Sequence, residues 1–196
     1  FAAGKVPHAY IFAGPDGVGK FRTARQWAKL LLCENPTIEK AKSGHFSDSC
    51  GSCQSCRLFE ADSHPDFNLI YKELRQYTAE GKGKSAPVDL PIDVIREFLI
   101  AKVGHKPTLS PRRVFVVSEA EKLNIASQNS LLKILEEPPP HAALVLISAS
   151  PDRLLATVLS RCQRLHLRPL TRAETRAQAQ SRGADGGRAE LAARAA

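Results

Sequence analysis

Residues 14–21 read Gly-Pro-Asp-Gly-Val-Gly-Lys-Phe, which is the spacing of a phosphate-binding loop at every position except the last. A loop of the form G-x-x-x-x-G-K-[ST] places backbone N–H groups and a lysine on phosphates, and its final hydroxyl group binds Mg²⁺. The residues that would cradle phosphates are Gly14, Gly17, Gly19 and Lys20. Phe21 stands where the hydroxyl group is needed. The loop therefore keeps an anion cradle and lacks one magnesium ligand.

The sequence on either side of this loop supports the interpretation. Residues 9–13 form an apolar run rich in the residues of buried strands, and residues 22–32 carry apolar side chains at helical spacing. Strand, glycine loop and helix follow in the required order, whereas a plain glycine turn with a solvated lysine is the weaker alternative. The sequence leaves ATP binding open and argues against Mg²⁺.

The rest of the chain alternates short apolar strands with helices. We expect strands at 66–70, 114–117, 143–147 and 163–167, helices at 92–103, 126–135 and 152–159, and a polar loop at 72–91. This order predicts an α/β fold in which a parallel sheet is covered by helices on both faces, with right-handed crossovers. After residue 170 no bulky apolar side chain occurs before Leu191, so two short helices around 183–187 would form only part of a second domain.

Four cysteines in an insert at about residues 33–56 predict a structural zinc site. Cys33, Cys50, Cys53 and Cys56 follow the spacing C-x16-C-x2-C-x2-C, and four thiolates complete a tetrahedral Zn²⁺ shell. Disulfides are the competing interpretation. His45 could replace one thiol but is more simply a surface histidine, and Cys162, beside an apolar strand, is more simply a small buried residue.

A second magnesium position is also altered. ATPases with this loop hold Mg²⁺ through an Asp at the end of an apolar strand, often followed by a Glu that polarises water. Here the strand 114–117 ends in Ser118-Glu119, so the carboxylate has become a hydroxyl group. Glu119 is a candidate catalytic residue, although a solvated or capping role fits it equally well. Arg161 could contact a phosphate or carboxylate, or reach into a neighbouring subunit's site.

Charge and hydropathy narrow the choice of partners. The 196 residues carry a net charge of +8, which favours polyanions or acidic partners. No apolar run is long enough to span a membrane and residues 1–5 lack a signal-peptide pattern, so we expect a cytoplasmic protein with no membrane partner. The absence of an initiator Met suggests that the sequence starts inside a longer protein. A stand-alone zinc-containing nucleic-acid binder is a weaker alternative.

Several motifs together resemble the clamp-loader subunits of bacterial DNA polymerase III, a branch of the AAA+ proteins. They are the segment 8–15, the cysteine insert, the L-L-K-I-L-E-E-P-P run at 131–139 and the S-R-C-Q run at 160–163. Within this branch, Phe21, Ser118 and the segment 150–155 resemble the delta prime type, a stator with a decayed ATP site, more than the ATP-hydrolysing gamma/tau motor.

The resemblance implies an AAA+ domain at 1–169, the start of a helical lid at 170–196, and a collar domain that this sequence does not include. It implies that the four cysteines bind zinc and that Arg161 acts in trans on ATP held by an adjacent gamma/tau subunit. It also implies contacts with the gamma/tau and delta subunits, and with the sliding clamp and primed DNA through the complex. The sensor-1 position of the family falls at Ser148 or Ala149.

Overall fold

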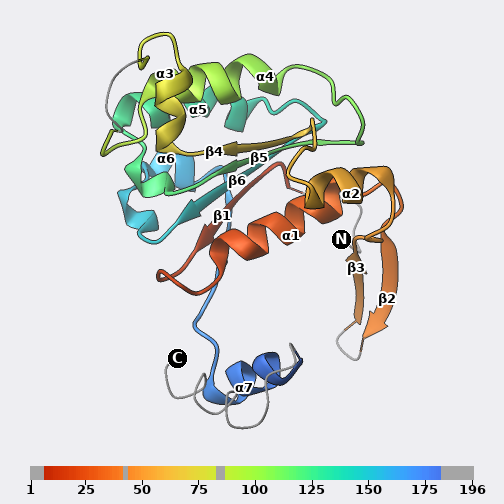
Figure 1. Ribbon diagram of the computed structural model, residues 1–196. Coiled ribbons are helices and arrows are strands. Elements are labelled where there is room, and N and C mark those ends of the chain that lie inside the picture. Colours follow the sequence, from red (N-terminus) through yellow and green to blue (C-terminus); the bar gives the residue numbers. More distant parts are fainter. Residues whose placement is uncertain (1–6, 42–43, 83–86, 182–196) are drawn as a thin grey trace.

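The computed structural model describes residues 7–41, 44–82 and 87–181. At its centre is a five-stranded parallel sheet in the order β4-β5-β6-β1-β7 (Figure 1). The strands are β1 (Ala9–Ala13), β4 (Phe67–Ile70), β5 (Arg113–Val117), β6 (Ala142–Ser148) and β7 (Gln163–His166). Each lies within one residue of its predicted bounds. The parallel α/β fold predicted from the apolar runs is confirmed.

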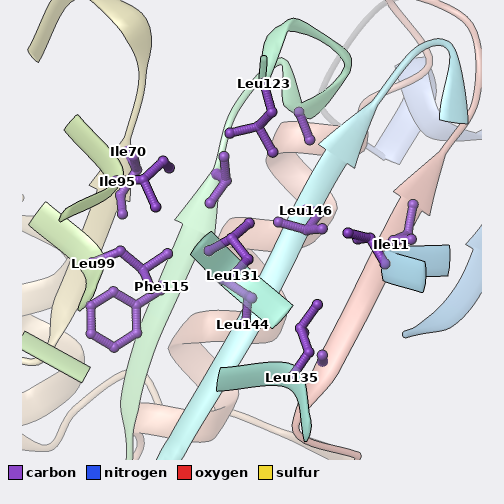
Figure 2. Packing of buried hydrophobic residues seen from close by; sticks show 14 of the residues in the cluster. Ile11, Ile70, Ile95, Leu99, Phe115, Leu123, Leu131, Leu135, Leu144 and Leu146 are labelled. Carbon is purple, nitrogen blue, oxygen red and sulfur yellow. The ribbon is translucent and has the colours of Figure 1, made fainter. Parts of the chain in front are cut away.

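Alternate side chains of the central strands enter two separate cores, one on each face of the sheet. Ile11 belongs to the larger core, together with Leu131 of α5 (Ile125–Glu136), as Figure 2 shows. Tyr10 and Phe12 belong to the other core, where Trp27 of α1 (Lys20–Leu32) packs edge-on against Tyr10 with ring centroids 4.7 Å apart. Because both of their faces are buried, the central strands β1, β5 and β6 are almost entirely apolar instead of alternating.

Four shorter helices divide between these two faces (Figure 1). α2 (Gln54–Glu60) lies beside α1, whereas α3 (Ile92–Ile95), α4 (Ala101–Val103) and α6 (Ala156–Leu159) pack on the α5 side. Residues 96–100, between α3 and α4, form a π-helical turn. The helix predicted at 92–103 is therefore present as a continuous helical segment that is α-helical at both ends and π-helical in the middle.

Two local predictions were wrong, and one pair of strands was not predicted. The expected loop at 72–91 begins with a 3-10 helix (Lys72–Tyr77), which is tied to α3 because Thr78 Oγ1 donates to Asp93 Oδ2 at 2.8 Å. The helix expected at 152–159 is interrupted, because Leu155 N donates to the buried Gln128 side chain instead of continuing a helix. The cysteine insert contains an unpredicted antiparallel hairpin, β2 (Thr37–Ala41) and β3 (Gly44–Asp48).

After β7 the chain leaves the sheet and forms α7 (Arg172–Ser181), which Figure 1 shows apart from the sheet and the helices that cover it. The two short helices expected around 183–187 lie outside the described residues. Among the described residues, no helix is both long and apolar enough to cross a membrane.

Candidate functional site

The glycine loop that the sequence predicts to bind phosphate connects β1 to α1. Gly17 and Gly19 have φ of 81° and 91°, in the left-handed region that favours glycine. Gly14, with φ of 154°, lies so close to the end of β7 that an added Cβ would come within 2.3 Å of the carbonyl oxygen of Leu167. The loop is thus fixed by its own glycines and by the edge strand of the sheet.

Lys20, at the start of α1, is turned back onto this loop. Its Nζ donates to the carbonyl oxygens of Gly14 at 2.7 Å and Pro15 at 2.8 Å, and lies 3.4 Å from a carboxylate oxygen of Asp16. The lysine side chain is buried, so these acceptors compensate the charge that burial takes out of water. In this arrangement the ammonium group acts as a cross-link of the loop.

The two altered magnesium positions meet in one open pocket of about 420 Å³ at the carboxyl ends of β5 and β6. Phe21 and Ser118 both line it, as do Lys20 and Glu119. Carboxyl ends of parallel strands are where α/β proteins place ligands. The pocket therefore gathers the residues expected at a nucleotide site, with a phenyl ring and a hydroxyl group where Mg²⁺ ligands would be needed.

Glu119 is held by two lysines. Its backbone is left-handed, with φ of 51°. One carboxylate oxygen lies 3.7 Å from Nζ of Lys72, and the other accepts a hydrogen bond from Lys122, whose pKa is raised above its ordinary value chiefly by that bond. A general base must present an oxygen to water. Both oxygens of Glu119 are instead paired with ammonium groups.

The pocket also contains residues that the sequence did not single out. Asp16 and Glu121 add two carboxylates to its wall, and a carboxylate oxygen of Glu121 accepts from the backbone N–H of Ala149 at 3.3 Å. Of the two sensor positions expected, Ala149 lines the pocket and Ser148 is fully buried at the end of β6. Successive side chains of an extended segment point to opposite sides, so Ser148 and Ala149 do not both face the pocket. The residue that lines it, Ala149, has no polar side chain.

The four predicted cysteines form a second site, at the end of α1 and the start of α2. Their Sγ atoms all lie within 4.8 Å of one another, with Cys33 at 3.6 Å from Cys50 and 4.0 Å from Cys53. Tetrahedral zinc with Zn–S bonds of about 2.3 Å separates its sulfur ligands by about 3.8 Å. The cluster thus fits one Zn²⁺ ion, and all four thiols are free cysteines.

Backbone amides point at these sulfur atoms. Cys53 N donates to Cys50 Sγ and Cys56 N donates to Cys53 Sγ, both at 3.4 Å, across the two C-x2-C turns. Gly51, with φ of 71°, allows the first turn to close. The Ser52 and Cys53 amides lower the pKa of Cys50 to about 6, whereas burial raises the pKa of Cys56 to about 12. A divalent cation is what would let all four thiols ionise at neutral pH.

A buried polar network fastens the cysteine cluster to the sheet. Ser55, which lies between two of the cysteines, donates to Leu32 O at 2.6 Å, and its hydroxyl oxygen lies 2.5 Å from Nε2 of His64 and 2.7 Å from Oγ of Ser110. Burial lowers the pKa of His64. This residue is thus held neutral inside a network that no spacing in the sequence revealed.

His45 and Cys162 belong to other parts of the fold. His45 is in β3, where its backbone lies opposite that of Lys40 in the register of the hairpin. Cys162 packs, half-buried, against the larger core, and burial raises its pKa to about 12. The four-thiol cluster among the described residues is formed without either of them.

Arg161, the remaining predicted site residue, lies between α6 and the edge strand β7. The residues that line the glycine-loop pocket do not include it. Its Nη1 donates to Thr157 O at 2.9 Å, and its Nη2 lies 2.7 Å from Oε1 of Glu136. The structure therefore does not bring Arg161 to the phosphate loop of its own chain.

Comparisons with known proteins identify the family of the chain. Residues 1–171 match the model of a family described as "DNA polymerase III, delta subunit". DNA polymerase III subunit delta' of Pseudomonas aeruginosa is 37% identical over 155 residues, which cover 79% of this chain and 41% of that protein. The Escherichia coli delta' subunit is 34% identical over 86% of this chain and 45% of its own length, and subunit tau of Bacillus subtilis is 30% identical over 85% and 26%.

Solved structures confirm the fold. A DNA polymerase III gamma subunit-related protein from Thermotoga maritima superposes with a TM-score of 0.50 at 17% identity, covering 96% of this chain and 54% of that one. The Thermotoga maritima RuvB Holliday junction branch migration motor gives a TM-score of 0.50 at 16% identity, over 98% of this chain and 50% of its own. The predicted AAA+ fold is thereby confirmed. The chain spans less than half the length of the delta' relatives above.

Proposed function

The chain belongs to the family described as "DNA polymerase III, delta subunit", and we propose that it serves in a clamp loader, as a delta prime subunit that does not itself hydrolyse ATP. In this role it would assemble with gamma/tau and delta subunits in the cytoplasm and help them load a sliding clamp onto primed DNA. The relatives named delta', at 34% and 37% identity, support this assignment.

The observation that carries the proposal is the pocket shared by Phe21 and Ser118. Phosphoryl transfer depends on metal ions that neutralise developing charge, and both protein ligands expected for that metal are missing. The pairing of Lys20 with the loop carbonyls and of Glu119 with two lysines supports the same conclusion. Any ATP in the loop would bind without the residues that drive its hydrolysis.

The alternative is an ATP-hydrolysing gamma/tau subunit, which the relatives named tau and the intact glycine conformations favour. A motor would need another hydroxyl group near the phosphates. Thr23 is exposed on α1 and is not one of the described residues that line the pocket. Thr23 therefore does not replace the hydroxyl group lost at Phe21.

We further propose that Arg161 is an arginine finger, which stabilises the transition state on ATP held by an adjacent gamma/tau subunit. An arginine used in trans must be reachable from outside, and the Arg161 side chain is about one-third exposed, at 35%, beside an edge strand whose four residues are all exposed. Its planar guanidinium suits the charge of a transferring phosphoryl group.

We assign the cysteine cluster to one structural Zn²⁺ ion, held by Cys33, Cys50, Cys53 and Cys56, because their geometry closes the shell without a position for substrate. We keep the division into an AAA+ domain at 1–169 and the start of a lid at 170–196 as part of the proposal. The separation of α7 from the sheet supports that boundary.

The finger role is tested with the full-length protein assembled with gamma/tau and delta. Arg161→Ala should leave assembly unchanged and lower DNA-stimulated ATP hydrolysis, because one gamma/tau site loses its finger, a group worth about 10³ to 10⁵ in rate at a single site. Arg164→Ala, which removes an exposed arginine of β7, is the matched control and should leave the rate unchanged. Full activity of the assembled Arg161→Ala complex would reject the finger.

A further inference from the structure

The guanidinium group of Arg161 is held in place by contacts from two elements. Its Nη2 lies 2.7 Å from Oε1 of Glu136, at the end of α5, while its Nη1 donates to Thr157 O at 2.9 Å and to Ser160 Oγ at 3.4 Å. Arginine presents five N–H donors. These contacts use at most three of them, so the group is both oriented and still able to donate to a phosphate.

Glu136 is itself placed by the core. It is the last residue of α5, directly after Leu135, whose side chain is buried and whose carbonyl oxygen contacts Nε2 of His8 at 3.1 Å. The carboxyl end of a helix carries a partial negative charge, which adds to the carboxylate in attracting a guanidinium. A rigid element of the α/β domain thereby determines where the end of a long, flexible side chain lies.

The same helix also fixes the chain segment that leads to Arg161. The buried side chain of Gln128, two turns earlier in α5, accepts from Leu155 N at 2.7 Å and donates to Arg153 O at 3.3 Å. Those contacts set the start of α6, and Arg161 follows α6 after one residue. α5 therefore controls both the backbone of the S-R-C segment and the side chain that it presents.

We propose that Glu136 is a positioning residue for Arg161. This inference rests on the finger role proposed above. Glu136 holds the guanidinium at the end of α5 before a neighbouring subunit docks. The arginine side chain therefore loses less conformational freedom when it meets a phosphate. The pair lies at the surface, with the Glu136 side chain 51% exposed, and surface ion pairs are weak enough to rearrange. The multiply charged γ-phosphate competes successfully with a single carboxylate.

The test uses the full-length protein assembled with gamma/tau and delta, with DNA-stimulated ATP hydrolysis measured across ATP concentrations. Glu136→Ala should lower kcat by about threefold to thirtyfold, because a loosened finger loses part of its effect, and should leave KM for ATP unchanged. Glu136→Gln, whose amide oxygen still accepts a hydrogen bond, should recover part of the loss. Glu137→Gln removes the adjacent exposed carboxylate and should behave as wild type.

The decisive comparison is made in the Arg161→Ala background, where adding Glu136→Ala should change nothing further. An unchanged or raised kcat for Glu136→Ala, in a complex that Arg161→Ala does impair, would overturn the positioning role and leave the finger standing. Equal losses from Glu136→Ala with and without Arg161 would overturn it as well. If Arg161→Ala itself had no effect, the finger role and the inference built on it would both be rejected.

Discussion

Arg113 donates from Nη2 to Oδ1 of Asp66 across 3.1 Å, and the Asp66 side chain is completely buried. The carboxylate also accepts from three consecutive backbone amides, those of Thr108, Leu109 and Ser110, at 2.7 to 3.0 Å. This arrangement ties the loop before β5 to the start of β4. It is connected to the polar network beside the cysteine cluster, because Ser110 belongs to both.

Asp66→Asn should lower the free energy of unfolding by about 3 to 5 kcal/mol, because Arg113 would lose its buried anionic partner. Chemical denaturation at pH 7 measures the change. Asp62→Asn, which removes the exposed carboxylate paired with Arg25, is the control and should cost at most about 1 kcal/mol. Equal effects of the two substitutions would contradict the importance of the buried pair.

The contribution of Asp66 should depend on pH. Burial alone raises its pKa, but the three amides and Arg113 outweigh burial and hold the pKa below the ordinary value of 3.8. A depressed carboxyl pKa adds stability above the unfolded pKa, and that stability is lost as pH falls through the folded pKa. The difference in unfolding free energy between wild type and Asp66→Asn should thus stay constant down to about pH 5 and shrink below the ordinary value. A difference that grows on acidification would contradict this.

Cys53→Ser should abolish binding of one zinc ion per chain and lower the melting temperature, because three thiols leave the tetrahedral shell open. Metal analysis of protein purified without chelator, followed by thermal unfolding, measures both effects. Cys162→Ser is the matched control, since this cysteine lies outside the cluster. It should retain a full equivalent of zinc. Less than about half an equivalent in the wild type would count against the site.

Strong local signals made most of the fold predictable. The apolar strands β1, β5 and β6 and the glycine loop were each marked by residues whose local preference agrees with their place in the fold, and the cysteine spacing identified a cluster that the structure brings together. Long-range side-chain contacts were not predictable. The break between Pro151 and Ala156 depends on Gln128, which lies over twenty residues earlier in the sequence and carries no signal of that role.

The sequence predicted which residues belong to the glycine-loop pocket better than it predicted the contacts of their side chains. The sequence identified Lys20 and Glu119 as candidates, yet it gave no indication that Lys20 turns back onto the loop or that Lys72 and Lys122 pair with Glu119. Lys72 stands in a polar segment that has the composition of a loop. Surface lysines are common, and only the fold determines which of them meets a carboxylate.

Lys20→Ala should destabilise the protein even without nucleotide, because the buried ammonium group bridges two loop carbonyls. We expect a loss of about 1 to 3 kcal/mol in urea denaturation, the cost of leaving buried acceptors unpaired. Arg22→Ala, in the same pocket wall but exposed, should change stability by less than about 0.5 kcal/mol. Wild-type stability of Lys20→Ala would show that the cross-link contributes nothing.

Phe21→Thr combined with Ser118→Asp should create magnesium-dependent nucleotide binding, because the pair restores a hydroxyl group and a carboxylate on one pocket wall. The dissociation constant of a fluorescent ATP analogue, measured with Mg²⁺ and with EDTA, should differ at least about tenfold in this variant. The control is Phe21→Ala with Ser118→Ala, which opens the pocket equally without adding ligands. If both variants respond alike to Mg²⁺, the restored groups do not reach the ion.

We propose that this chain lends chemistry to a neighbour and performs none of its own. The sharpest test is steady-state ATP turnover by the purified full-length protein, with Mg²⁺ and without partner subunits. We predict turnover indistinguishable from that of a buffer control, because Phe21 and Ser118 supply no metal ligand of the expected type. Turnover above about 1 s⁻¹, within the range typical of enzymes and abolished by Lys20→Ala, would show that the chain is itself an ATPase.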